Sequence, residues 1–297
     1  MTRKIALLIA ASAVIATPVL AFQAQGEQEA TQPTILDRVL DRVLGPAEQP
    51  QAEPTATSPA APTALSAVLA ADYRADDRAR DRYRHPAETL AFMGVEPDMT
   101  VLEVGPGING WYAKILIPYI ALTGNYYGSN PGPSGRAMTD EQRARAAQFG
   151  DRFRTEGEEL LGVDRERINY VWSDDYTEEM NGTFDRVLLF RVLHGMRNGD
   201  VLLRELRRYR QLLADDGMIG VVQHRAPESE TWERSNGSRA YLRQSDVIAL
   251  FELAGFELAA SSEINANLND PADHEVGVWV LPPMTFLERP GEQTIDR

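Results

Sequence analysis

The sequence predicts an α/β protein built on a doubly wound, mainly parallel sheet. From residue 100 onward, short β-branched strands alternate with longer segments of helical periodicity. This alternation is typical of a parallel sheet that helices cover on both faces. A glycine-rich turn follows the first of these strands, and no helix separates the last two. Together these observations predict the fold class.

Seven segments have the length and composition of buried strands. They are residues 100–104, 125–128, 168–172, 184–190, 218–223, 256–264 and 276–281. Between them, residues 111–119 and 200–213 have helical patterns, and a further helix is predicted from Ser245 to Gly255. We expect one domain over residues 64–284, followed by a C-terminal tail over residues 285–297.

The first 21 residues have the order of a secretory signal peptide. Arg3 and Lys4 supply positive charge, an apolar run too short for a comfortable membrane span extends to Leu20, and Ala21 offers a small residue for cleavage. An uncleaved membrane anchor is the alternative. We expect residues 1–21 to be removed and the mature protein to be periplasmic or secreted, without a stable membrane span.

Residues 22–63 are rich in Gln, Ala, Pro, Thr and Glu. Such a composition buries too little apolar surface to offset the entropy of ordering, so we expect a disordered tether. A short tandem repeat over residues 35–44 interrupts it and places its apolar residues on one helical face. The repeat predicts either a transient helix or a helix that docks on a partner or on the domain itself.

Charge and composition exclude several classes of function. The chain has 44 acidic residues against 30 lysines and arginines, a formal net charge of −14, which repels a phosphate backbone. We therefore expect no nucleic-acid binding. The chain has no cysteine, which excludes a thiol nucleophile and a Cys-ligated metal, and we predict no metal site. Residues 76–84 alternate acids with arginines, and we expect them to face solvent.

The most informative stretch runs from Glu103 to Gly110 and reads Glu-Val-Gly-Pro-Gly-Ile-Asn-Gly. It follows a predicted strand and opens a helix, the context in which a Gly-x-Gly-x-x-Gly pattern binds a nucleotide. Gly105 permits the tight turn, and Gly107 lets a ligand approach the backbone. Gly110 lets the helix and the strand pack closely. The pattern predicts a ligand site at this turn.

The residues around the turn disfavour a nicotinamide dinucleotide. A dinucleotide site places an acid about 20 residues further on, at the end of the second strand, whereas residues 126–130 read Tyr-Tyr-Gly-Ser-Asn. The carboxylate of Glu103 would also repel a pyrophosphate. Both observations argue against an NAD(P)-dependent oxidoreductase.

These motifs resemble those of class I S-adenosyl-L-methionine (SAM) dependent methyltransferases and, more narrowly, a family of exported bacterial proteins predicted to be methyltransferases. The resemblance covers roughly residues 65–283. The segments that carry it are residues 80–90, 103–112, 192–194, 223–226, 262–267 and 277–283. It implies a Rossmann-like methyltransferase fold of seven strands with an antiparallel last strand, and SAM as the cofactor.

The resemblance implies a role for each residue of the glycine-rich turn. Gly105, Gly107 and Gly110 would wrap the methionine part of SAM, with Glu103 at the start of the loop. The glycines and Glu103 are therefore expected to bind the cofactor.

Three further residues match positions that border the cofactor in this family. Asn130 stands where an acid usually binds the ribose hydroxyls, and an amide forms no charge-assisted pair there. Asp174 matches the position that contacts the adenine amine. Arg191 follows the fourth strand and faces the ligand crevice.

His194 and His224 are the candidate catalytic residues. Both end predicted strands at the carboxyl edge of the sheet, where doubly wound folds bind ligands. Methyl transfer from a sulfonium needs a base only when the acceptor carries a proton, and neutral imidazole can accept that proton. The alternative is a structural histidine bound to loop backbone.

The sequence leaves two functions open. The first is a SAM-dependent methyltransferase that acts outside the cytoplasm on an unidentified small or surface acceptor. The second is a non-catalytic binding or scaffold protein on the same fold. Asn130 and an exported location favour the second, whereas the glycine motif, Glu103 and Asp174 favour the first.

Overall fold

The computed structural model describes residues 3–10, 65–107, 110–132, 140–267 and 269–280. The predicted cleavage point at residue 21, the tether over residues 22–63 with its repeat at 35–44, and the tail over residues 285–297 lie outside the described residues. Among those that are described, no helix is long and apolar enough to span a membrane.

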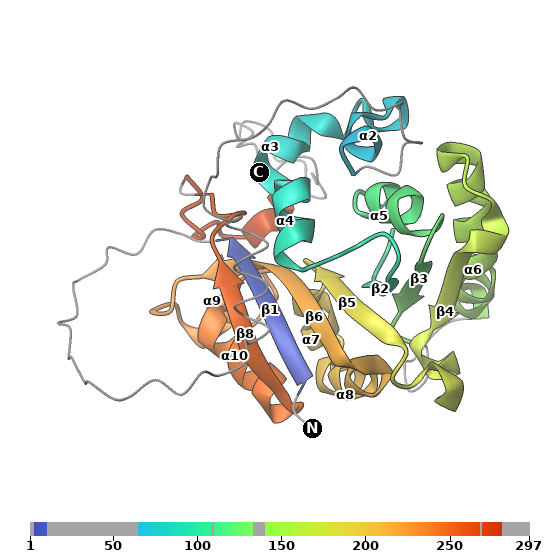
Figure 1. The fold of residues 1–297 in the computed structure, drawn as a ribbon. Coiled ribbons are helices and arrows are strands. Elements are labelled where there is room, and N and C mark those ends of the chain that lie inside the picture. The colour runs from blue at the N-terminus through green and yellow to red at the C-terminus, as the bar shows by residue number, and fades with distance from the viewer. Residues whose placement is uncertain (1–2, 11–64, 108–109, 133–139, 268, 281–297) are drawn as a thin grey trace, which may run out of the picture.

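One sheet organises the described residues. Its strands follow the order β4-β3-β2-β5-β6-β1-β8 (Figure 1). The short strand β7 pairs with β6, and every pairing between these strands is parallel. The predicted fold class is therefore confirmed. The strands are β1 Arg3–Ala10, β2 Thr100–Val104, β3 Asn125–Asn130, β4 Ile168–Trp172, β5 Phe184–Phe190, β6 Leu213–Ala226, β7 Leu242–Arg243 and β8 Phe256–Ser262.

Helices cover both faces of the sheet because the central strands bury side chains in both directions. One core cluster packs α4, α5 and α6 against the sheet, and the other packs α7, α8 and α10 against the opposite face. The α-helices are α2 Leu65–Ala70, α3 Asp81–Arg84, α4 Pro86–Phe92, α5 Ala113–Ile120, α6 Asp140–Leu161, α7 Leu193–Asn198, α8 Leu202–Leu212, α9 Trp232–Ser235 and α10 Gln244–Leu253. Short 3₁₀ helices join them at Asp72–Arg74, Arg78–Arg80, Arg165–Arg167, Ser173–Asp175, Glu178–Met180 and Gly277–Val280.

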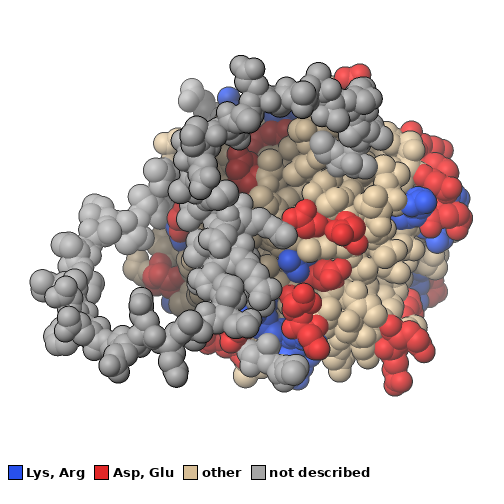
Figure 2. Space-filling model, viewed as in Figure 1, with Lys and Arg blue, Asp and Glu red and all other residues tan. Residues whose placement is uncertain are grey.

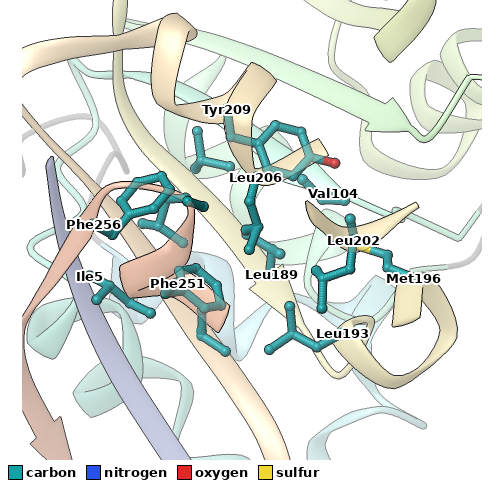
Figure 3. Packing of buried hydrophobic residues seen from close by; sticks show 14 of the residues in the cluster. Ile5, Val104, Leu189, Leu193, Met196, Leu202, Leu206, Tyr209, Phe251 and Phe256 are labelled. Atoms are coloured by element: carbon teal, nitrogen blue, oxygen red, sulfur yellow. The ribbon is translucent and has the colours of Figure 1, made fainter. Parts of the chain in front are cut away.

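Strand β1 comes from the segment whose sequence predicts a signal peptide. It lies between β6 and β8 and pairs with both, as the blue strand in Figure 1 shows. Ile5 is 1% exposed and belongs to the cluster of Figure 3, where it lies near Phe251 and Phe256. The Arg3 guanidinium forms an ion pair with Asp215 at 3.2 Å. The same apolar run that suits a signal peptide thus also suits a buried strand.

The predicted antiparallel strand over residues 276–281 is wrong for the residues that the structure describes. Gly277–Val280 forms a 3₁₀ helix, and the Val278 N–H donates to the carbonyl of Arg239 at 3.3 Å. The physical reason is that β1 already bonds to the facing edges of β6 and β8. The position between β6 and β8 is therefore filled.

The surface reflects the acidic composition. On the face shown in Figure 2, Asp and Glu side chains form several groups, and Lys and Arg are fewer.

Candidate functional site

The turn after β2 requires glycine at its first position. Gly105 has a φ of 72°, in the left-handed region. Its N–H donates to the carbonyl of Ser129 at 2.7 Å, which ties the turn to the end of β3. A Cβ at Gly105 would lie 2.8 Å from Cγ1 of Val192, so a side chain there would collide with the segment that follows β5.

Gly110 and Gly107 have different roles in the same turn. The Gly110 N–H donates to the carbonyl of Gly107 at 2.7 Å, and a Cβ at Gly110 would lie 2.7 Å from that oxygen. Gly110 is therefore needed to close the turn. A Cβ at Gly107 would meet only backbone atoms of Gly110, at the ordinary contact distance of 3.6 Å. Gly107 is exposed, so its backbone is open to a ligand. The fold itself does not require a glycine at this position.

Glu103 is buried in β2 just before this turn. Its side chain is 4% exposed and accepts a hydrogen bond from the hydroxyl of Tyr126 at 2.7 Å. Burial raises the pKa of Glu103 to about 7, and the hydrogen bond from Tyr126 opposes this rise. Within the described residues the carboxylate has no cationic partner, so a cation bound at the turn would complement it.

Asn130, at the end of β3, turns its amide oxygen toward the glycine turn. Its Nδ2 donates to the hydroxyl of Tyr170 at 2.9 Å. Its Oδ1 lies 4.0 Å from the position of a Cβ on Gly105. The amide oxygen is thus placed to accept one hydrogen bond from a ligand hydroxyl, which is the part of the acid's role that an amide can keep.

Asp174 lies in the short 3₁₀ helix after β4, where it pairs with a cation of the chain itself. Arg208 of α8 contacts Asp174 at 3.0 Å and the buried Glu205 at 3.2 Å. The Asp174 carboxylate also packs on Gly132, where a Cβ would overlap it. Asp174, Arg208 and their neighbours line a polar cavity of about 290 Å³. Sequence reasoning missed this ion pair, because the two residues lie far apart along the chain.

Arg191 stands directly after β5 in a strained backbone conformation. Its φ is 57°, which is unfavourable for a residue with a side chain. Its guanidinium carbon lies 5.9 Å from the centroid of the Tyr112 ring, and that ring stacks on Phe190 at 3.5 Å. The strained turn therefore directs Arg191 toward residues that follow the glycine turn.

The expectation that residues 76–84 face solvent is wrong for the side chains that matter here. Asp77 is 8% exposed and pairs with Lys114 of α5 at 2.7 Å. Its carbonyl accepts a hydrogen bond from the indole N–H of Trp111 at 3.1 Å. The guanidinium carbon of Arg84 lies 4.7 Å from the Trp111 ring centroid. This segment covers the start of α5, and sequence reasoning missed Arg84 because alternating charges usually mark an exposed surface.

The two candidate histidines lie on neighbouring elements. His194, in α7, is 9% exposed, and its Nδ1 is 3.5 Å from Nε2 of Gln223. A Cβ on Gly237 would lie 3.3 Å from the His194 backbone. His224, in β6, meets the edge of the Tyr241 ring at a centroid distance of 6.1 Å. Both histidines therefore contact the segment that connects β6 to β7, and their catalytic role stays a prediction.

Within the described residues, no group of three or more His, Asp or Glu side chains is arranged to hold a metal ion.

Comparison with known proteins gives structural likenesses and no family. No protein-family model matches the sequence, and no curated protein matches it. Solved structures similar to this chain include a SAM dependent methyltransferase from Aquifex aeolicus, with a TM-score of 0.41 and 17% identity over 65% of this chain and 88% of that chain. The CurJ carbon methyltransferase has a TM-score of 0.38 and 15% identity over 74% of this chain and 59% of that chain.

A third similar structure is CrArsM, an arsenic (III) S-adenosylmethionine methyltransferase from Chlamydomonas reinhardtii. It has a TM-score of 0.33 and 20% identity over 54% of this chain and 52% of that chain. Identities this low do not transfer a substrate or an activity to this chain.

Proposed function

We propose that the chain is a SAM-dependent methyltransferase. The observation that carries this proposal is the pairing of an open backbone at Gly107 with the buried carboxylate of Glu103 at the carboxyl edge of the sheet. A sulfonium ligand with an amino-acid part carries the cationic groups that such a carboxylate lacks.

The residues present fit SAM in part. Gly105 and Gly107 would lie against its methionine part, Glu103 would face its ammonium group, and the Oδ1 of Asn130 would accept a hydrogen bond from a ribose hydroxyl. When bound, SAM supplies an electrophilic methyl group that needs no activation by the protein. The chain's own contribution is therefore to hold the acceptor in line with that methyl group and to exclude water.

A base is needed only if the acceptor is protonated. His194 and His224 stay our candidates for this role because His194 follows β5 and His224 lies near the carboxyl end of β6. His194 contacts Gln223, and His224 meets the edge of the Tyr241 ring.

One observation favours the alternative of a non-catalytic binding protein. Asp174, the residue expected at the adenine amine, is bound to Arg208 at 3.0 Å. A carboxylate held in an ion pair is a weaker acceptor for a neutral amine than a free one. Asn130 in place of an acid also weakens the contact with the ribose hydroxyls. Two polar contacts to the nucleoside, one to the adenine and one to the ribose, are therefore weaker than in a site with two free acids.

Location is a separate proposal that the N-terminal residue order supports. We propose that the protein is exported, with cleavage after residue 21. Cleavage would remove β1, so in the mature protein another segment would have to pair with β6 and β8. N-terminal sequencing of the native protein and its cell fraction tests this proposal, and a cytosolic protein that retains residues 3–10 would overturn it.

Titration calorimetry with SAM and with S-adenosylhomocysteine tests the main proposal directly. We expect saturable binding of both by the chain, and weakened binding by a Glu103→Gln variant for SAM. A folded chain that binds neither compound at millimolar concentration would leave the non-catalytic alternative.

A further inference from the structure

Two arginines from distant parts of the chain face the aromatic residues that follow the glycine turn. The guanidinium carbon of Arg84 lies 4.7 Å from the Trp111 ring centroid, and that of Arg191 lies 5.9 Å from the Tyr112 ring centroid. The two rings meet edge to face with centroids 4.7 Å apart. Tyr112 in turn stacks on Phe190. The aromatic pair thus forms a packed platform that carries both guanidinium groups.

The positive charge on this platform is not balanced within the described residues. The side chains of Arg84 and Arg191 form no ion pair or hydrogen bond with any residue that the structure describes. The nearby acids are bound elsewhere, since Asp77 pairs with Lys114 and Asp81 pairs with Arg74, each at 2.7 Å. Within the described residues each guanidinium therefore has an aromatic ring and no anion as its partner. A desolvated charge without a counter-ion is costly, and such groups concentrate at binding sites.

The two arginines also repel each other. Burial is the largest cause that lowers the pKa of Arg84 to about 8; Arg191 and Arg80 contribute to this fall, whereas Tyr112 and Asp77 oppose it. Burial likewise lowers the pKa of Arg191, Tyr112 opposes this fall, and Arg80 adds to it. Because a guanidinium keeps its proton in proteins, these shifts describe positive charge that is removed from water and only partly compensated at the platform. The left-handed φ of 57° at Arg191 adds backbone strain at the same place.

We propose that Arg84 and Arg191 form a binding site for an anionic group of the methyl acceptor, a carboxylate or a phosphate. This proposal rests on the proposed function. The site borders the cofactor turn, because Val192 follows Arg191 and its Cγ1 lies 2.8 Å from the Cβ position of Gly105. Guanidinium groups bind carboxylate and phosphate oxygens through paired, charge-assisted hydrogen bonds.

The balance of charge indicates the acceptor and not the cofactor as the source of the anion. SAM carries a sulfonium, an ammonium and one carboxylate, so it is a net cation. Binding it beside two guanidinium groups that have no ion pair within the described part of the chain leaves the site positive even if one arginine contacts the methionine carboxylate. An acceptor with its own negative group removes this excess and would be held close to the methyl donor.

Calorimetry with inorganic phosphate tests the site in the full chain, with and without saturating S-adenosylhomocysteine. The variants are Arg84→Gln and Arg191→Gln, with Arg84→Lys as the conservative change. Arg207→Gln, at an exposed position of α8, is the matched control. We expect phosphate to bind the wild type and the control, and its affinity to fall at least about tenfold in both Gln variants. The lysine variant should keep most of the affinity, and S-adenosylhomocysteine affinity should change less than about threefold.

Three results would overturn the proposal. The first is absence of phosphate binding to the wild type. The second is a loss of S-adenosylhomocysteine affinity in the Gln variants with unchanged affinity for methylthioadenosine, which lacks the methionine carboxylate; the arginines would then serve the cofactor. The third is a lower unfolding temperature in the Gln variants together with unchanged phosphate affinity, which assigns them to structure.

The two proposals fail in different ways. A wild type that binds phosphate but neither SAM nor S-adenosylhomocysteine retains the anion site and refutes the methyltransferase. A wild type that binds S-adenosylhomocysteine but not phosphate refutes only the anion site.

Discussion

The titration of Glu103 makes a quantitative prediction about stability. Its carboxylate is 4% exposed, and burial raises its pKa from the ordinary 4.5 to about 7. Between these two pH values the unfolded chain has released the proton while the folded chain keeps it. The free energy of unfolding therefore falls as the pH rises from 4.5 to about 7, and this contribution is constant above that range. The rise in pKa corresponds to about 3 kcal/mol.

Glu103→Gln removes this titration and keeps the shape of the side chain. The amide oxygen can still accept the hydrogen bond from Tyr126. We expect the variant to unfold at the same denaturant concentration as wild type near pH 4.5, and to be more stable than wild type by about 3 kcal/mol at pH 8. Urea unfolding followed by circular dichroism at intervals across this range measures the difference, and all other titrating groups cancel.

Glu233→Gln is the matched control, because Glu233 is exposed and the same chemical change should leave the pH profile unaltered. Equal pH slopes in wild type and Glu103→Gln would refute the reasoning. A cationic ligand adds a second readout. Since a bound ammonium favours the ionised carboxylate, the affinity of wild type for SAM should increase from pH 6 to pH 8, and that of Glu103→Gln should not.

Three other perturbations address the turn, the first strand and the histidines. Gly107→Val should leave the unfolding temperature unchanged and weaken SAM binding at least about tenfold. The control Gly195→Ala, at a position with open space around it, should change neither quantity. Calorimetry that shows wild-type SAM affinity in Gly107→Val would exclude the turn as the site. Deleting residues 1–21 gives the chain proposed for the exported protein, so it should leave the thermal unfolding temperature close to that of the full chain, with another segment beside β6 and β8. A marked fall would show that β1 itself is needed between these strands and would count against cleavage after residue 21. His194→Ala and His224→Ala should keep SAM affinity within about threefold, while one of them loses about 100-fold in turnover once an acceptor is found; normal turnover in both would assign the histidines to structure.

Most of the sheet could be predicted from local pattern. The strands at Thr100–Val104, Ile168–Trp172 and Phe184–Phe190 have the predicted bounds. An apolar, β-branched run of this length between turn residues is typical of a buried strand. The glycine turn could also be predicted from the sequence, since the backbone conformation of the turn itself requires glycine at Gly105 and Gly110.

The sequence did not predict which segments, distant along the chain, pair with each other in the sheet. Residues 3–10 and 276–281 both have the apolar composition of a strand, and composition does not say which of them lies between β6 and β8. Only the tertiary structure decides this, because the outcome depends on the two exposed strand edges and on the pocket that receives Ile5.

The candidate site divides in the same way. The sequence by itself determined which residues reach the carboxyl edge of the sheet, since strand direction and strand ends are properties of local pattern. The tertiary structure decided which partners those residues find there. Asp174 meets Arg208, and Arg84 meets Trp111 close to Arg191. Charges interact through space over several ångströms and not along the chain, so neither the ion pair nor the uncompensated arginines could be foreseen before the segments that carry them were packed together.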